Sequence, residues 1–525
     1  MALNPSVQVP LPEHGIAFKK VSGKTYVYYV TATYRNEKGR PTCDRTSIGR
    51  LDEASGKLIP NRNYYEIYLN QSQPLQGGIF DYGVYYVFYK IAKELGLYSI
   101  LKKLFPDNFK EILTVAQYMF ASGNVMSYID YYTQTHETVL KEELRDTRCS
   151  KLFASIRQED IFLFMREWMK RMKKDEYLAY DVTSISSYAK NMEELEWGYN
   201  RDKERLPQIN MGMYYAEKTK LPLYYRIYPG SISDKVHLRY MVEDNAIISN
   251  ERVRYVMDRG FYSSENLNFL VSNAYRFIIA LPLSLRYCQN LIKKHKNEIV
   301  NISECKLGKH LPYAKSYDIN ELGFRMRAHI YYEPEKALRD SEALYELIER
   351  QENDLKAMEE PPEKKYHYDR YFFINRSKEG KLGFVRNHKA IDEALSMCGF
   401  FIIAETDFRK SSKEILEIYR NRDVVEKSFD NLKNELDFKR LHTHNQDTTQ
   451  GKIFVSFIAL IIKSYILNHT NEGLQMTQKQ LLLELDKIKI LKSNEKSKPR
   501  LINPLTKSQR SILEALNLSP DPLFV

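Results

Sequence analysis

The chain has 525 residues, of which 43% are hydrophobic and 28% are charged, and its formal net charge is +11. A chain of this length predicts about three to four domains, and this composition excludes disorder of the whole chain. The positive charge fits a polyanion partner such as nucleic acid, because clustered Lys and Arg side chains gain free energy by displacing its counterions.

The cysteines and the apolar runs indicate a cytoplasmic protein. The five cysteines are odd in number and form no CxxC pair, so neither a zinc site nor a disulfide framework is expected. The first residues do not have the pattern of a secretory signal. The most apolar run, 453–462, ends at Lys463 and is too short to span a bilayer, so we expect a buried helix and no membrane partner.

The first third of the chain predicts two modules. Residues 16 to about 70 alternate between apolar and polar side chains, with turn signals at NEKGRP and DEASGK, which is typical of a small β module with basic edges. From about 77 to 175 the periodicity becomes helical. We expect the β module to contact DNA, and the helical domain to bind DNA, form a dimer or serve in packing.

The middle of the chain predicts a mixed sheet. Three strand patterns, EYLAYDVTSISSY, QINMGMYYA and LPLYYRIYPG, precede a helix, the strand VRYVMDRGF, a second helix and the strand FIIALP. A ribonuclease-H-like core has this order of elements. Residues 283–397 interrupt it with more strand patterns and a charged helix. The strand GFFIIAETD then leads through the capping box Ser411-x-x-Glu414 into another helix.

The predicted fold class is therefore α/β and multidomain. The expected domains are 1–75, an N-terminal β module; 76–175, a helical domain; 176–282, the first part of the core; 283–397, an insertion domain; 398–470, the second part of the core; and 471–525, a C-terminal helical tail. The tail contains two further capping boxes, at Thr477 and Thr506.

Two aspartates in the strand patterns are candidate metal-binding residues. Asp181 interrupts an otherwise apolar strand and Asp258 ends another, and a carboxylate in a sheet is costly without charge partners. Either residue alone could simply cap a turn. With a third acid, they could hold two divalent ions about 3.5 to 4 Å apart, the arrangement that cleaves phosphodiesters. Hard carboxylate oxygens suit Mg²⁺, and Mn²⁺ can substitute.

The stretch IYRNRDVVEKSFDNLK, 418–433, reads as an amphipathic helix. At about 100° per residue, one strip about 60° wide carries four polar side chains, namely Tyr419, Arg422, Glu426 and Lys433. An apolar stripe lies beside it, made of Val425, Phe429 and Leu432. A charged strip next to a buried stripe indicates a helix that borders a cleft.

Periodicity does not single out Glu426 as the third acid. Asp423 and Asp430 lie close to the same strip, and Glu405 and Asp407 follow the preceding strand. At this level all five acids remain candidates.

The spacing Tyr-x2-Arg-x3-Glu-x6-Lys resembles the YREK signature of bacterial insertion-sequence DDE transposases of the IS-four superfamily. The stretches YDVTS around Asp181, LPLYYRIYPGSISD and MDRGFYS around Asp258 resemble the same superfamily. The strand module that ends in TSIGRLDE looks like that of the IS-sixteen-thirty-four group.

The resemblance implies a ribonuclease-H-like core in which Asp181, Asp258 and Glu426 bind two Mg²⁺ ions, with a mostly β insertion domain at 283–397. It also implies that Tyr419, Arg422 and Lys433 contact DNA. Arg259 could touch a phosphate or form a salt bridge. For Arg422 the alternative is an i,i+4 salt bridge with Glu426.

The function that the resemblance implies is cut-and-paste transposition. The enzyme would bind the terminal inverted repeats of its element in double-stranded DNA, form a synaptic homodimer, cleave the ends through hairpins and join them to target DNA. One alternative is a ribonuclease-H-like, structure-specific nuclease. The other is a domesticated, transposase-derived DNA-binding protein. A location in the cytoplasm, at the nucleoid, is expected.

Overall fold

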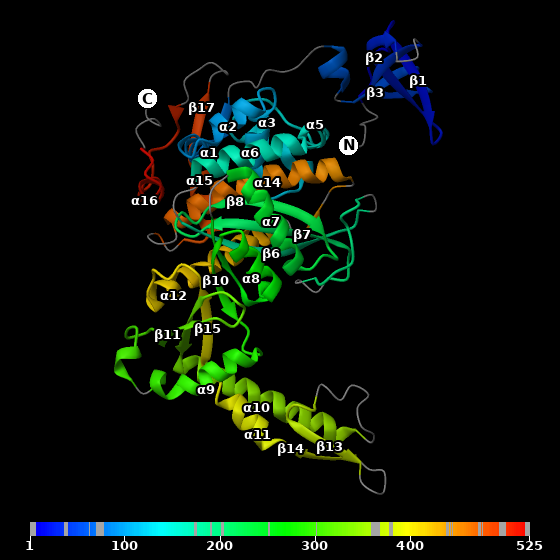
Figure 1. The fold of residues 1–525 in the computed structure, drawn as a ribbon. Helices are drawn as coiled ribbons and strands as arrows, with labels where there is room; N and C mark the ends of the chain where they lie inside the picture. Colours follow the sequence, from blue (N-terminus) through cyan, green and yellow to red (C-terminus); the bar gives the residue numbers. More distant parts are fainter. Residues whose placement is uncertain are drawn as a thin grey trace. The chain divides into compact units, whose positions relative to one another are not determined.

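A computed structural model gives the fold (Figure 1). It describes residues 7–35, 40–61, 63–69, 78–172, 176–189, 192–200, 204–249, 253–300, 302–358, 368–376, 382–436, 440–441, 443, 445–470, 474, 476–492 and 500–519. These residues form two compact units. The first lies within 1–80 and 489–503, and the second within 81–488 and 504–522.

The first unit contains an antiparallel sheet with the strand order β1-β2-β3-β4. Its strands are β1 (Ile16–Val21), β2 (Lys24–Arg35), β3 (Pro41–Asp52) and β4 (Lys57–Pro60). Ser22 and Gly23 both have positive φ, as the tight hairpin turn between β1 and β2 requires. The predicted β module and its DEASGK turn are confirmed, whereas most of NEKGRP lies outside the described residues.

A second, three-stranded sheet has the order β18-β17-β5. Its strands are β5 (Gly78–Asp81), β17 (Lys489–Lys492) and β18 (Arg500–Leu501). The predicted C-terminal helical tail thus also contains β17 and β18, which the sequence did not reveal because pairing rather than a local pattern stabilises them. The tail's two capping boxes are confirmed at α15 (Gln478–Asp486) and α16 (Lys507–Ala515).

The second unit begins with the predicted helical region. Its helices are α1 (Gly83–Glu94), α2 (Leu97–Leu104), α3 (Phe109–Ser122), α4 (Ile129–Thr135), α5 (Asp146–Ser155) and α6 (Gln158–Met172). α14 (Gln446–Thr470) packs against α3 and α5. This helix is long and apolar enough to cross a membrane, but 83% of its apolar window is buried inside the protein. The prediction of a buried helix is confirmed.

A mixed sheet forms the centre of the second unit (Figure 1). Its strands are β6 (Tyr177–Ser187), β7 (Gln208–Ala216), β8 (Pro222–Pro229), β9 (Arg254–Met257), β10 (Arg276–Leu281), β11 (Tyr313–Ile319), β12 (Met326–Tyr332), β15 (Phe400–Glu405) and β16 (Arg440–Leu441). They follow the order β11-β12-β15-β10-β9-β6-β7-β8, and β16 pairs with β6. β6 runs antiparallel to β7 and parallel to β9.

Helices cover both faces of this sheet. On one face, Tyr180 of β6 meets His237 of α7 (Asp234–Ser249). On the other, Tyr177 of β6 and Val256 of β9 join a core cluster with α12 (Ser412–Asn421). Because strand side chains alternate between faces, odd-numbered residues of β6 face α12 and even-numbered ones face α7.

The insertion prediction needs correction. α9 (Arg286–Val300) has 15 residues and α10 (Pro334–Ala357) has 24, whereas no described strand between 283 and 397 exceeds seven. The described insertion is therefore mostly helical, not mostly β. Its strands β11 and β12 also extend the central sheet, since β12 pairs with β15. The remaining elements, β13 (Phe372–Arg376), β14 (Leu382–Arg386) and α11 (His388–Leu395), pack with α10 around a small core of their own.

His237 makes stability depend on pH. Its side chain is fully buried, and burial lowers the pKa of His237 to about 3, with a smaller contribution from the charge of Arg226. In the unfolded chain the pKa of a histidine is about 6.5, so below that pH the unfolded chain binds the extra proton. The stability contributed by neutral His237 is therefore present above about pH 6.5 and falls as the pH drops toward 3.

We expect the wild-type protein to lose about 2 kcal/mol more unfolding free energy than His237→Gln between about pH 6.5 and about pH 5. Urea unfolding at the two pH values measures this difference. Glutamine cannot titrate, so equal losses in both proteins would show that His237 is not the group responsible.

Candidate active site

Asp181 and Asp258 lie next to each other on neighbouring parallel strands. Tyr180 of β6 is the register partner of Met257 of β9, and each aspartate follows one of these residues. Asp181 faces the α12 side because it is four residues after Tyr177, and Asp258 does so because it is two residues after Val256. The strand register therefore brings two carboxylates to one place on one face.

The two aspartates differ in their surroundings. Asp181 lies inside β6, is 5% exposed and accepts a hydrogen bond from the Val182 N–H at 2.8 Å. Asp258 is half-buried and caps a 3-10 turn by accepting from the Arg259 N–H at 2.7 Å. The capping alternative thus describes Asp258, whereas Asp181 lies well inside its strand rather than at its end.

The stretch 418–433 is not one regular α-helix. α12 ends at Asn421, α13 (Asp423–Asp430) follows Arg422, and a π-helical turn occupies Asn431–Glu435. At the break, backbone hydrogen bonds join residues three apart. The Arg422 N–H donates to the carbonyl oxygen of Tyr419, and the Val425 N–H donates to the carbonyl oxygen of Arg422. Asn and Asp compete for backbone hydrogen bonds, which explains a break at N-R-D that apolar periodicity does not reveal.

The predicted apolar stripe is nevertheless buried. Val425, Phe429 and Leu432 are at most 5% exposed, and α13 packs against β6 and β7. The Ser428 hydroxyl also donates to the Tyr215 hydroxyl of β7 at 2.7 Å. This hydrogen bond also holds α13 against the sheet, and sequence patterns could not predict it because its two residues are 213 positions apart.

Arg422 lies among the acids. Its side chain is buried, and its Nη2 atom is 3.1 Å from Glu426 Oε1 and 4.0 Å from Asp423 Oδ1. Burial lowers the pKa of Arg422, but Tyr419, Asp258, Glu426 and Asp181 together raise it above its ordinary value. One guanidinium thus lies in the field of all three predicted metal ligands. The i,i+4 salt bridge considered as the alternative for Arg422 is present, and it joins this cluster.

The other predicted DNA-contact residues have different environments. The Tyr419 hydroxyl donates to Asp258 Oδ1 at 3.3 Å, and burial is the main reason that the pKa of Tyr419 is raised. Arg259 is exposed and its charge acts on Tyr419. Lys433 is only 6% exposed, on the π-helical turn. Tyr419 and Arg259 therefore border the aspartates, whereas Lys433 is buried within the helix packing.

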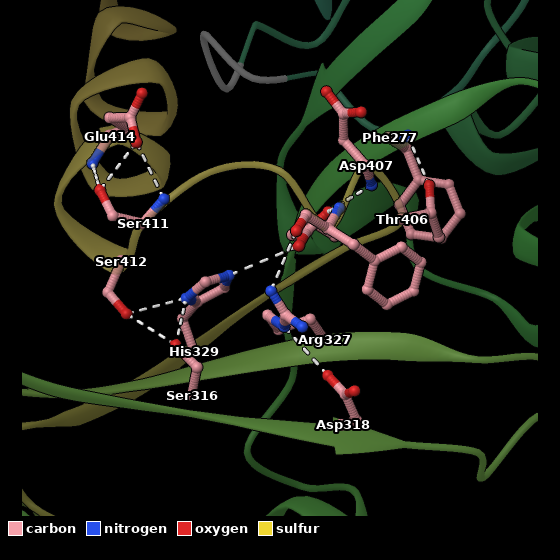
Figure 2. A network of polar contacts seen from close by, with 12 residues as sticks. Phe277, Ser316, Asp318, Arg327, His329, Thr406, Asp407, Ser411, Ser412 and Glu414 are labelled. Carbon is pink, nitrogen blue, oxygen red and sulfur yellow. Dashed lines mark hydrogen bonds and ion pairs between the residues drawn. The ribbon is translucent and has the colours of Figure 1, made fainter.

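Two of the alternative third acids are held by other contacts. Glu405 is fully buried at the end of β15, and its Oε2 atom accepts from the backbone N–H groups of Asp407 and Phe408. Its Oε1 atom is 3.8 Å from His329 Nε2, while His329 Nδ1 lies 2.9 Å from the Ser412 hydroxyl (Figure 2). Glu405 therefore fixes the turn that leads to α12.

Asp407 belongs to a separate charge cluster. Its Oδ2 atom accepts from the Tyr177 hydroxyl at 2.9 Å, and its Oδ1 atom pairs with Arg409 at 2.7 Å and with Arg276. Burial raises the pKa of Asp407, but these partners outweigh it and hold the pKa below its ordinary value. Asp423 and Asp430, by contrast, are both exposed on α13.

The donor set fits a hard divalent cation in chemistry, since Asp181, Asp258 and Glu426 offer only carboxylate oxygens. Among the residues that the structure describes, no three His, Cys, Asp or Glu side chains come together as a metal site, and Glu426 is paired with Arg422 instead. For all three acids to bind metal, Glu426 would therefore have to break its ion pair with Arg422 and bind the metal instead.

Comparison with known proteins identifies the family. Residues 173–462, more than half of the chain, match the family described as "Transposase DDE domain". The chain therefore belongs to the DDE transposase family of transposition enzymes. The search of curated proteins gave no match.

A solved structure is also similar to this chain, a piggyBac transposase synaptic complex with hairpin DNA determined by cryo-electron microscopy. The two share 11% sequence identity with a TM-score of 0.33, over 82% of this chain and 74% of the other.

Proposed function

We propose that this protein is a cut-and-paste DNA transposase that binds the terminal inverted repeats of its insertion sequence, cleaves them and joins them to target DNA. The observation that carries the proposal is the cluster in which Asp181 and Asp258 follow register partners on neighbouring parallel strands, Tyr419 donates to Asp258, and Arg422 lies 3.1 Å from Glu426. Family membership gives the reaction class, and this cluster lies inside the matched residues.

A ribonuclease-H-like core is the fold that we propose for the catalytic part. The strand order β8-β7-β6-β9-β10 supports it, with β6, β7 and β8 antiparallel and β9 and β10 parallel to β6. The elements between β10 and β15 then form the insertion. We assign the chain to the IS-four superfamily, and within it to the IS-sixteen-thirty-four group, on the signature residues and the TSIGRLDE module.

The proposed roles follow from the contacts. Asp181, Asp258 and Glu426 would hold two divalent ions, Mg²⁺ or Mn²⁺, which supply an activated water and stabilise the departing oxygen. Arg422, once released from Glu426, has guanidinium donors for a phosphate, and its Nε atom is buried without a hydrogen-bond partner among the described residues. Tyr419 and Arg259 would contact the DNA end beside Asp258. Lys433 would contact the same DNA strand.

We further propose that two copies assemble on the paired ends, that cleavage passes through hairpin ends, and that the enzyme works in the cytoplasm at the nucleoid. The +11 net charge supports binding of the DNA backbone. These steps all use one set of carboxylates, since each is a phosphoryl transfer.

A joining assay tests the proposal. The full chain is mixed with Mg²⁺, a pre-cleaved duplex ending in the element's terminal repeat, and a plasmid target. We expect the free 3′-hydroxyl of the repeat to become linked to the plasmid. A matched duplex with a 3′-dideoxy end should bind equally well but form no joined product.

The two rival functions give different results in this assay. A structure-specific nuclease would cut the duplex or plasmid without linking them. A domesticated DNA-binding protein would bind the repeat and do neither. Either result would contradict the proposed function.

A further inference from the structure

A pocket of about 340 Å³ lies at the start of β6, five residues before Asp181. The beginnings of β6 and β9, the turn after β7 and one side of α12 line it. It is separate from the carboxylate cluster described above, and the inference drawn from it does not depend on the proposed function.

Two buried carboxylates form the inner part of this pocket. Glu176 is 4% exposed and Glu217 is 7% exposed. The Oε2 atom of Glu176 accepts from the backbone N–H groups of Lys218 at 2.6 Å and Thr219 at 3.2 Å, whereas its Oε1 atom is buried with no hydrogen-bond partner among the described residues. Burial raises the pKa of Glu176, and the charge of Glu217 adds to this effect. The two backbone hydrogen bonds lower the pKa but do not offset the rise. A buried carboxylate oxygen without a partner is costly.

The cations that line the pocket are held elsewhere. Arg254 lies over the Tyr177 ring, at 4.7 Å, and 3.8 Å from Asp407. The Nζ atom of Lys410, which precedes α12, is 3.8 Å from Oε1 of Glu414 in the first turn of that helix. Lys218 has an exposed side chain whose charge lowers the pKa of Glu176 without reversing the effect of burial. Among the residues that the structure describes, these lining cations are thus paired away from the inner acids or exposed.

The rest of the lining includes apolar and acidic side chains and the amide of Asn421. Tyr177 and Ile418 contribute buried apolar side chains, and Glu417, on the same turn of α12, is exposed. The pocket therefore offers carboxylates at its inner part, an apolar wall, and a further carboxylate at the surface. A linear chain with a cation at each end and methylenes between them has the complementary pattern.

We propose that this pocket binds an aliphatic diamine, with one ammonium group against Glu176 and Glu217 and the other beside Glu417. The Asn421 side chain already donates to Glu217 at 2.5 Å, and Asn421 is the last residue of α12. The pocket therefore adjoins the end of α12, immediately before Arg422.

Calorimetric titration of putrescine, a four-carbon diamine, into the DNA-free full chain tests the proposal. We expect saturable binding of one diamine per chain, weakened at least about tenfold by Glu176→Gln, because one charge-assisted contact is lost. Glu417→Gln, at an exposed position where folding is not at risk, should also weaken binding. Lys218→Met should strengthen it by removing a competing charge, and Glu349→Gln, which removes an exposed acid of α10, should leave it unchanged.

Two further ligands separate the alternatives. n-Butylamine, with one ammonium group, should bind more weakly than putrescine, and Mg²⁺ at matched ionic strength should not compete. Equal affinities for putrescine and n-butylamine, full competition by Mg²⁺, or unchanged binding in Glu176→Gln and Glu417→Gln would each overturn the proposal.

Discussion

Replacing Glu426 with Gln is expected to abolish Mg²⁺-dependent cleavage of a labelled terminal-repeat duplex while leaving DNA binding intact. Metal ions contribute several kcal/mol of transition-state stabilisation, and a loss of about 4 kcal/mol corresponds to a rate decrease of about 10³-fold. Gln keeps the shape of the side chain and its contact with Arg422 but cannot supply a charged ligand. Cleavage on a denaturing gel and binding by gel shift measure the two effects separately.

Matched variants on the same helix are the controls. Asp423→Asn and Asp430→Asn also remove one negative charge from α13, and we expect each to cleave within about tenfold of the wild-type rate. If Glu426→Gln still cleaves and Asp423→Asn does not, the third ligand is Asp423, whose carboxylate is 4.0 Å from Arg422 Nη2. Loss of activity in all three variants would indicate a requirement for net charge rather than for one ligand.

Replacing Gly451 with Ala is expected to destabilise the second unit by about 2 kcal/mol. A Cβ atom at Gly451 of α14 would lie 2.1 Å from the backbone oxygen of Phe153 in α5. Alanine gains about 1 kcal/mol over glycine in a helix, but overpacking costs about 1 to 3 kcal/mol or more. A backbone carbonyl cannot move aside as a flexible side chain does, so the steric cost should win. Urea unfolding followed by circular dichroism measures the change.

Gly260→Ala provides the comparison, because a Cβ atom at Gly260 would meet nothing within 4 Å. We expect its stability to stay within about 0.5 kcal/mol of the wild type. If Gly451→Ala were as stable as Gly260→Ala, the close approach of α14 to α5 would not exist in solution.

Local patterns were enough to predict several elements of the central sheet and the helices next to it. Strands β6 to β10, helix α7 and the capping box at Ser411 all appear where periodicity and capping residues place them. Asp181 and Asp258 could be selected because a charged residue in an apolar strand breaks a local rule. The roles of these residues as metal ligands remain predictions.

For β6 to β10 and α7, the sequence alone thus determined the type of each element and its apolar side, because propensity, alternation and capping act between residues close in the chain. Tertiary structure alone decided that β12 pairs with β15, that Glu405 and Asp407 are held by partners remote from the aspartates, and that Arg422 lies among three acids. Apart from the i,i+4 pair of Arg422 and Glu426, these contacts join distant segments, and no local pattern records which distant group satisfies a buried charge.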